Sequence, residues 1–172
     1  MVIDLQEKFA PVIHDWESVL KRSVRLIRFF HLLRAPILVS EQYPKGLGAT
    51  VQPVFEALKE TQPTISSKMA FSACAVSELK QKMRQTRRKQ WVVCGIEGHV
   101  CVQQTVLDLL DQGMEVFVAR DAVGSRHTPD RDAAFARMAH SGAVESTSES
   151  LIFESLRDAT HPLFKQAAAL VR

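Results

Sequence analysis

Long hydrophobic runs are absent from this sequence of 172 residues, since no stretch approaches the roughly 18 consecutive apolar residues that a membrane span needs. Neither sign of charge dominates: Lys and Arg total 22, Asp and Glu total 19, and the formal net charge of +3 is a poor argument for nucleic-acid binding. Cysteine is scarce, with three residues, and the acidic first segment shows no secretory signal. An odd number of cysteines without such a signal indicates reduced thiols and a cytoplasmic location. We therefore expect neither a membrane nor a nucleic acid as a partner.

The residues that are present fit one globular domain. Apolar residues make up 46% of the chain and charged residues 24%, a balance that excludes a disordered protein. A typical domain takes about 100–200 residues, and a chain of this size builds a core without disulfides or metal. We therefore expect residues 1–172 to form a single domain.

Short apolar segments alternate along the chain with longer segments of helical periodicity. Strands are predicted at Ile37–Val39, at Trp91–Cys94 and at Met114–Ala119, the last of which is broken by Arg120-Asp121. Near-continuous apolar strands that alternate with amphipathic helices are typical of a parallel sheet covered on both faces. The pattern predicts an α/β protein with a three-layer Rossmann-like fold, built on a parallel sheet of about six strands with helices on both faces.

Polar residues follow three of the predicted strands, and in such sheets functional groups gather at the carboxyl ends of the strands. Asp4 follows the first apolar run, Lys68 follows a weak strand at Thr64–Ser67, and Cys101 follows Trp91–Cys94 after a turn that contains two glycines. The pattern places these three side chains at one edge of the sheet.

Cys101 is the candidate nucleophile, because a thiol in the first turn of a helix feels the positive end of the helix dipole, which favours the thiolate. Gly95 and Gly98 let the backbone turn sharply and present N–H groups to an oxyanion. Asp4 could accept the thiol proton, and Lys68 could keep the carboxylate charged or lower the pKa of the thiol. Position alone also allows ordinary roles: a buried cysteine, a capping aspartate and a solvated lysine.

Five segments carry a resemblance to a known family: Val2–Gln6 (VIDLQ), Lys68–Ser72 (KMAFS), Gly95–Thr105 (GIEGHVCVQQT), Asp121–Arg126 (DAVGSR) and Gly142–Phe153. In these segments, their order and their spacing, the whole chain resembles the isochorismatase-like cysteine hydrolases, which include nicotinamidases and N-carbamoylsarcosine amidohydrolases. The Gly95–Thr105 passage is the specific one. The Gln42–Gly48 loop and the Asp158–Lys165 tail are most similar to the isochorismatase domain-containing subgroup.

The resemblance implies a catalytic triad of Asp4, Lys68 and Cys101. It also implies a cis peptide bond between Ile96 and Glu97, with the N–H groups of Glu97 and Cys101 forming an oxyanion hole. Relatives are commonly oligomers, so the resemblance further implies a homo-oligomer.

Phe9 and Phe71 match positions that line a small substrate pocket in the family, and Tyr43 could join them from the Gln42–Gly48 loop, although all three equally fit ordinary core aromatics. Nicotinamidases carry an Asp-x-His metal motif after the second strand, where this chain reads Ser40–Lys45 without histidine. The six histidines offer no pair at metal-ligand spacing. We therefore expect no metal and no cofactor.

The sequence thus predicts a cysteine-dependent hydrolase that cleaves a C–N bond of a small amide-like substrate through a thioester. The alternative is a catalytically silent member of the family that binds a small molecule or a protein. Two basic segments, Lys21–Arg34 and Lys80–Lys89, fit solvated helix surfaces better than a membrane or nucleic-acid site, because no aromatic platform interleaves the second.

Overall fold

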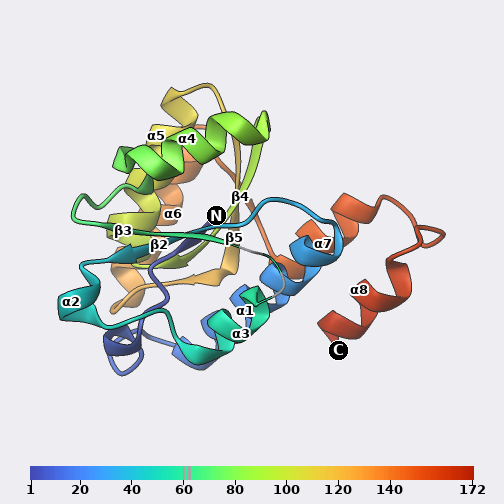
Figure 1. Ribbon diagram of the computed structural model, residues 1–172, viewed down its shortest axis with the longest axis horizontal. Helices are drawn as coiled ribbons and strands as arrows, with labels where there is room; N and C mark the ends of the chain where they lie inside the picture. The colour runs from blue at the N-terminus through green and yellow to red at the C-terminus, as the bar shows by residue number, and fades with distance from the viewer. Residues whose placement is uncertain (60, 62) are drawn as a thin grey trace.

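The computed structural model describes residues 1–59, 61 and 63–172, and its centre is a six-stranded sheet (Figure 1). The strands are β1 (Val2–Ile3), β2 (Leu38–Gln42), β3 (Thr64–Lys68), β4 (Gln90–Ile96), β5 (Glu115–Gly124) and β6 (Val144–Ser146). They lie in the order β3-β2-β1-β4-β5-β6, and every pairing between them is parallel. This arrangement confirms the predicted α/β class and the parallel sheet.

Helices cover both faces of the sheet (Figure 1). One face carries α1 (Trp16–Leu32), α3 (Gln52–Leu58), α7 (Ser148–Leu156) and α8 (Phe164–Val171). The other carries α4 (Ser77–Thr86), α5 (Gln103–Asp111) and α6 (Thr128–His140). Shorter turns are η1 (Glu7–Phe9), α2 (Pro44–Leu47), η2 (Ala73–Ala75) and the π-helical η3 (Gly98–Val102).

The core consists of two apolar layers, because successive residues of a strand point to opposite faces of a sheet. On β1, Val2 packs in the layer below α1, whereas Ile3 packs in the layer below α5. The stripe on α1 that includes Leu26 and Phe29 is fully buried in the first of these layers. Burial on both faces explains why the strands are near-continuous apolar runs.

Strand β5 continues through Arg120-Asp121, so the predicted break at this position is wrong. Its pairing with β4 shifts register between Val93 and Gly95, which lets the polar pair bulge out of the ladder. Both side chains find partners there: Arg120 lies over the Phe135 ring and bonds to Glu145, and Asp121 accepts hydrogen bonds from Ser148 at the start of α7.

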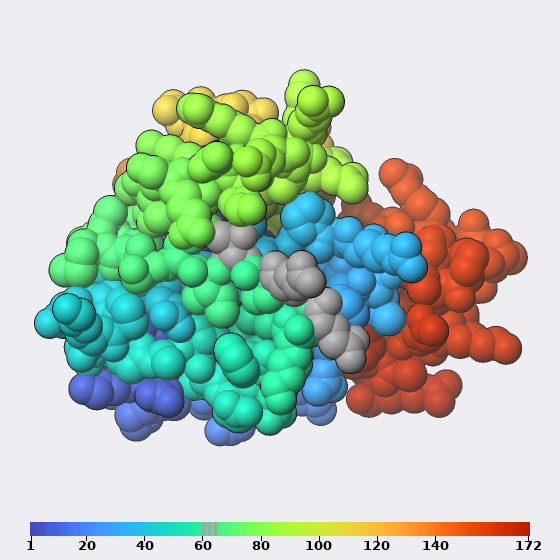
Figure 2. Space-filling view, viewed as in Figure 1, coloured from blue at the N-terminus to red at the C-terminus, as the bar shows by residue number. Residues whose placement is uncertain are grey.

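The first helix is fastened to the last one by a buried arginine. Arg25 of α1 donates from Nε to the Leu170 carbonyl (3.0 Å) and from a terminal nitrogen to the Val171 carbonyl (3.3 Å). These carbonyls lie in the last turn of α8, where intrahelical partners are missing. The C-terminal segment accordingly lies against α1 at one side of the molecule (Figures 1 and 2).

Among the described residues, no helix combines the length and the apolar character needed to cross a bilayer.

The strand order reverses between β1 and β4. From β1 the chain adds β2 and β3 on one side of the sheet, and β4, β5 and β6 then follow on the other side. Open parallel sheets bind ligands outside the carboxyl ends of the strands at this point. Asp4 follows β1 directly, and the turn that leads to Cys101 follows β4. The fold therefore brings two of the candidate residues to the place where a site is expected.

Candidate active site

Asp4 lies in the middle of the site and is completely buried. Its backbone is left-handed (φ 52°), a conformation that aspartate tolerates better than most residues, and its N–H donates to the Ser40 carbonyl of β2 (3.0 Å). The Ser40 hydroxyl donates to Oδ1 of Asp4 (2.7 Å). The main chain and one carboxylate oxygen are thus held by the neighbouring strand.

Lys68 ends β3 and reaches across β2 to Asp4. Its Nζ donates to Oδ2 of Asp4 (2.7 Å) and to Oε1 of Gln42 (2.6 Å), and the side chains of Lys68 and Asp4 are both inaccessible to solvent. Gln42 is the register partner of Lys68 on β2. The ammonium is therefore held between one charged and one neutral acceptor.

Cys101 lies in η3, the π-helical turn that precedes α5, and is only 4% exposed. Its thiol donates to Oε1 of Gln42 (3.9 Å) and lies close enough to Asp4 and Lys68 for their charges to act on it. Its carbonyl accepts a hydrogen bond from the Thr105 hydroxyl (2.7 Å), which fixes the turn to α5. Asp4, Lys68 and Cys101, predicted from separate segments, thus form one buried cluster.

Two glycines lie where the backbone leads from β4 to Cys101, and the first of them is required. At Gly95, where φ is 125°, a Cβ atom would lie 2.1 Å from the Ile3 carbonyl oxygen, so β1 and β4 could not approach each other. At Gly98, a Cβ atom would lie 2.9 Å from the Ser125 hydroxyl. The peptide bond between Ile96 and Glu97 is cis.

Burial dominates the electrostatics of the cluster. It raises the pKa of Asp4 above its ordinary value, although Lys68 and hydrogen bonds from Ser40 and Cys101 oppose the shift. Burial, followed by the negative charge of Asp4, raises the pKa of the Cys101 thiol to about 12. Desolvation and the neighbouring carboxylate therefore outweigh the effect of the helix dipole, which alone would favour the thiolate.

Charged and polar groups that follow β4 and β5 contact one another beside the turn that carries Cys101. The Glu97 carboxylate pairs with the half-exposed Arg126 guanidinium, which raises the pKa of Arg126. His99 Nδ1 lies 3.1 Å from the Ser125 hydroxyl. The same hydroxyl fills the space beside Gly98, so these contacts support the turn that carries Cys101.

The three aromatic residues predicted to line a pocket lie in different environments. Phe9 is half-buried and packs against the core below α1. Tyr43 is 47% exposed and Phe71 is 50% exposed, and both flank residues of the cluster, since Tyr43 follows Gln42 and Phe71 lies three residues after Lys68. Their contact with a substrate stays a prediction.

Sequence reasoning missed two glutamines that hold the site together. Gln42 contacts both Lys68 and Cys101, while the Gln6 side chain bonds to the N–H (2.7 Å) and the carbonyl (3.0 Å) of Gln42. Gln6 is completely buried. The available signal was the alternation Ser40-Glu41-Gln42, which places Ser40 and Gln42 on one face at the carboxyl end of a buried strand.

A metal does not fit the residues of this site. The described part of the chain contains no group of three or more His, Cys, Asp or Glu side chains that could hold one. In the segment where nicotinamidases carry their metal motif, the Glu41 carboxylate instead accepts hydrogen bonds from the Thr50 N–H and hydroxyl (both 2.7 Å).

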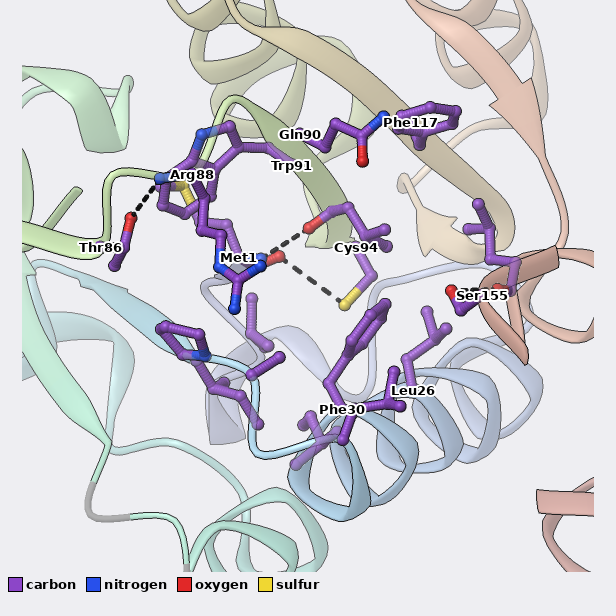
Figure 3. A pocket seen from close by; sticks show the side chains of 18 of the residues that line it. Met1, Leu26, Phe30, Thr86, Arg88, Gln90, Trp91, Cys94, Phe117 and Ser155 are labelled. Carbon is purple, nitrogen blue, oxygen red and sulfur yellow. Dashed lines mark hydrogen bonds between the residues drawn. The ribbon is translucent and has the colours of Figure 1, made fainter. Parts of the chain in front are cut away.

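A cavity of about 480 Å³ lies at the opposite, amino ends of the strands (Figure 3). Its walls are largely apolar and include Phe30 and Phe117, and the Met1 ammonium donates to the Val92 carbonyl beside it (2.6 Å). Asp4, Lys68 and Cys101 do not line this cavity, so it is separate from the cluster.

Fold and site together define a three-layer α/β protein with a buried aspartate, lysine and cysteine at the switch point of a parallel sheet. The sequence model of the isochorismatase domain matches residues 1–150. The chain is 40% identical over 169 residues to isochorismatase domain-containing protein 2A of Mus musculus, covering 98% of this chain and 80% of the relative. The chain therefore belongs to the isochorismatase family, a family of hydrolases.

Two solved structures extend the comparison. The MAR1 ribonuclease of Caenorhabditis elegans superposes with a TM-score of 0.94 at 41% identity, over 99% of this chain and 86% of the other. The YcaC gene product of Escherichia coli, an octameric hydrolase of unknown specificity, superposes with a TM-score of 0.90 at 22% identity, over 98% and 83% of the two chains. The second likeness shows the shared fold alone.

Proposed function

We propose that this protein hydrolyses a small amide-like C–N bond with Cys101 as the nucleophile, Asp4 as the proton carrier and Lys68 as the cation that holds them together. The observation that supports the proposal is the buried Asp4–Lys68 ion pair at the carboxyl edge of the sheet, with the Cys101 thiol and the Lys68 ammonium both bonded to Gln42. The reaction needs no metal or cofactor, because the thiol and the carboxylate supply both the nucleophile and the proton transfer.

The proposed reaction has two halves. Asp4 takes the proton of the Cys101 thiol as sulfur attacks the carbonyl carbon, and the new oxyanion is stabilised by the N–H groups of Glu97 and Cys101. The C–N bond then breaks, and protonated Asp4 gives its proton to the departing nitrogen. Water next attacks the thioester, with Asp4 accepting one of its protons. The C–S bond breaks, Asp4 returns that proton to the departing Cys101 sulfur, and a carboxylic acid is released.

The two raised pKa values support this division of roles. A thiol with a pKa of about 12 is protonated at rest, so it needs a base in contact with it when substrate arrives. The raised pKa of Asp4 makes its carboxylate a better proton acceptor than an exposed aspartate. The slight exposure of Cys101 favours a small substrate.

The test is a screen of small amides, ureides and carbamoyl compounds with the wild type, Cys101→Ala and Cys94→Ala. We expect Cys101→Ala to lose at least about a thousandfold in kcat/KM, because the covalent step is removed. Cys94 is a matched buried cysteine outside the cluster, with its sulfur 3.9 Å from the Met1 carbonyl, and its substitution should keep turnover. Mass spectrometry of the quenched reaction should show an acyl group on Cys101. Turnover that survives in Cys101→Ala would overturn the proposal.

The binding-module alternative makes the opposite prediction. A catalytically silent protein would turn over no compound in the screen, while ligand binding would raise the melting temperature equally in the wild type and in Cys101→Ala.

RNA hydrolysis is a second candidate function. The similar C. elegans structure is named as a ribonuclease, and six basic residues of the segment Lys80–Lys89 are exposed on α4 and the turn that follows it. Cleavage of a short single-stranded RNA would support it if the activity falls both in Cys101→Ala and in a variant with Lys82 and Arg84 changed to Gln. Loss in neither variant would indicate a contaminating nuclease.

A homo-oligomer and a cytoplasmic location complete the proposal. The octameric YcaC product is one neighbour that assembles in this way, and the three cysteines of this chain are unpaired. Light scattering on the purified protein tests the first point.

A further inference from the structure

Gln42 contributes a neutral side chain that accepts hydrogen bonds from both Lys68 and Cys101, and its orientation is fixed. Its amide nitrogen donates to the Met69 carbonyl (2.9 Å). A carbonyl oxygen only accepts hydrogen bonds, so the amide nitrogen must face Met69 and the amide oxygen must face the ammonium and the thiol. The side chain is 8% exposed and thus has little room to turn over.

The backbone of Gln42 is held as firmly as its side chain. Gln6 brackets it with two hydrogen bonds and donates a third to the Gly48 carbonyl (2.7 Å), which ties the end of β2 to the loop after α2. A residue held from both sides can impose a position on its neighbours. We infer that the structure does this for Lys68 and Cys101.

We propose that Gln42 is a positioning residue that holds the Lys68 ammonium on Asp4 and keeps the Cys101 thiol protonated until substrate arrives. The negative end of its amide dipole lies 2.6 Å from Nζ and 3.9 Å from Sγ. It attracts the ammonium and accepts the S–H proton, but it repels a thiolate. The inference rests on the triad proposed above.

The charged and polar groups near Cys101 other than Asp4 and Lys68 are engaged with partners of their own, so they do not position the ammonium or the thiol. Asp4 from the end of β1 and Lys68 from β3 are the charges that act directly on the thiol. From the ends of β4 and β5, Glu97 is paired with Arg126, which also feels Asp130 of α6, and His99 contacts Ser125. From η2, Cys74 contacts the Thr105 carbonyl of α5.

Two nearly isosteric substitutions should move the reactivity of Cys101 in opposite directions. Gln42→Met removes the dipole and frees a donor of Lys68 for the thiolate, so alkylation of Cys101 by iodoacetamide at pH 8.5 should become about threefold faster or more. Gln42→Glu adds a negative charge beside the sulfur, so the rate should fall about tenfold. The rate is followed across pH 7–10, with the labelled cysteine identified by mass spectrometry.

The control pair is Gln52→Met and Gln52→Glu on α3, where the glutamine is exposed and bonds only to Glu56 among the described contacts. These variants should keep the wild-type profile. Melting temperatures show that each variant is folded. Profiles that do not move, or that move in the same direction for Met and Glu, would overturn the inference. Because alkylation needs no substrate, this outcome is independent of whether Cys101→Ala retains turnover.

Discussion

The Asp4–Lys68 ion pair makes each partner depend on the other, because neither side chain contacts solvent. A buried pair contributes little net stability compared with apolar residues of the same size, but the loss of one partner leaves an uncompensated charge. The surrounding hydrogen bonds from Ser40 and to Gln42 are built for a charged pair. The arrangement of charges in the site is therefore fixed, and the site tolerates substitution of either charged residue poorly.

Replacement of Lys68 should expose this dependence. We expect Lys68→Met to lower the free energy of unfolding by about 3–5 kcal/mol at pH 7, because Asp4 must stay buried without its cation or take up a proton. The folded-state pKa of Asp4, already raised by burial, rises further, so the loss should shrink as the pH falls toward 4.

Urea denaturation of the wild type and the variant between pH 4 and 7 measures this difference. The double variant Asp4→Asn/Lys68→Met serves as the control, since it removes both charges and should lack the pH dependence. A penalty that is constant across this range would contradict a charged Asp4.

The residues that sequence reasoning found share one property: each ends or follows a strand and has a side chain suited to acid–base or nucleophilic chemistry. Asp4, Lys68 and Cys101 were identified on this basis and by family resemblance. Gln42 was not, because an amide has no reactivity of its own, and its importance comes from contacts that only the register of β2 against β3 creates. The raised pKa of Cys101 was missed for the same reason, since burial is a tertiary property.

At the scale of elements, the turn from β4 to η3 depends on the close approach of β4 to β1. The sequence predicted a strand at Trp91–Cys94 that ends at Gly95, whereas β4 continues to Ile96 and pairs there with the end of β5. Glycine allows this continuation, because its positive φ and its missing side chain leave room for the Ile3 backbone.

A pair of glycine substitutions separates crowding from backbone strain. Gly95→Ala should cost about 3–5 kcal/mol of stability, since it combines an unfavourable φ with a Cβ atom 2.1 Å from a carbonyl oxygen. Gly142→Ala should cost about 1–2 kcal/mol, because φ is also positive (106°) but the space is empty within 4 Å. Thermal unfolding compares the two, and equal losses would show that crowding at β1 is unimportant.

For the molecule as a whole, the three buried cysteines couple stability to alkaline pH. Burial raises the pKa of Cys94, raises that of Cys74 to about 11 and, together with Asp4, raises that of Cys101 to about 12. The unfolded chain releases these protons near pH 9, whereas the folded chain still holds them. Stability is therefore fully present below pH 9 and is lost as the pH rises toward the folded-state values.

Cys74 provides the measurable case. Between pH 9 and 11, Cys74→Ala should reduce the pH slope of the unfolding free energy by about 1.4 kcal/mol per pH unit, the value for one proton. Chemical denaturation at three or four pH values gives the slope, which is independent of the constant loss from the cavity that the substitution leaves. An unchanged slope would mean that Cys74 titrates alike in both states.

The overall architecture could be predicted from the sequence, because strands that are buried on both faces of a sheet have near-continuous apolar sequences. The contacts of individual polar groups did not, since Arg120 and Asp121 looked like a strand end until their partners on α6, α7 and β6 were known. Hydrophobic periodicity along the chain thus predicts the layers of the fold, whereas the contacts of polar side chains determine where a strand bulges or ends.

The hydrogen bonds from Arg25 to the last turn of α8 have a consequence for synthesis in the cell. Helix α1 is synthesised early, but the carbonyl groups that Arg25 binds belong to residues 170 and 171. The apolar surface of α1 that α8 covers is therefore exposed to solvent while the intervening residues are synthesised. The nascent protein must therefore keep that flank from aggregating until α8 has been synthesised and has folded against it.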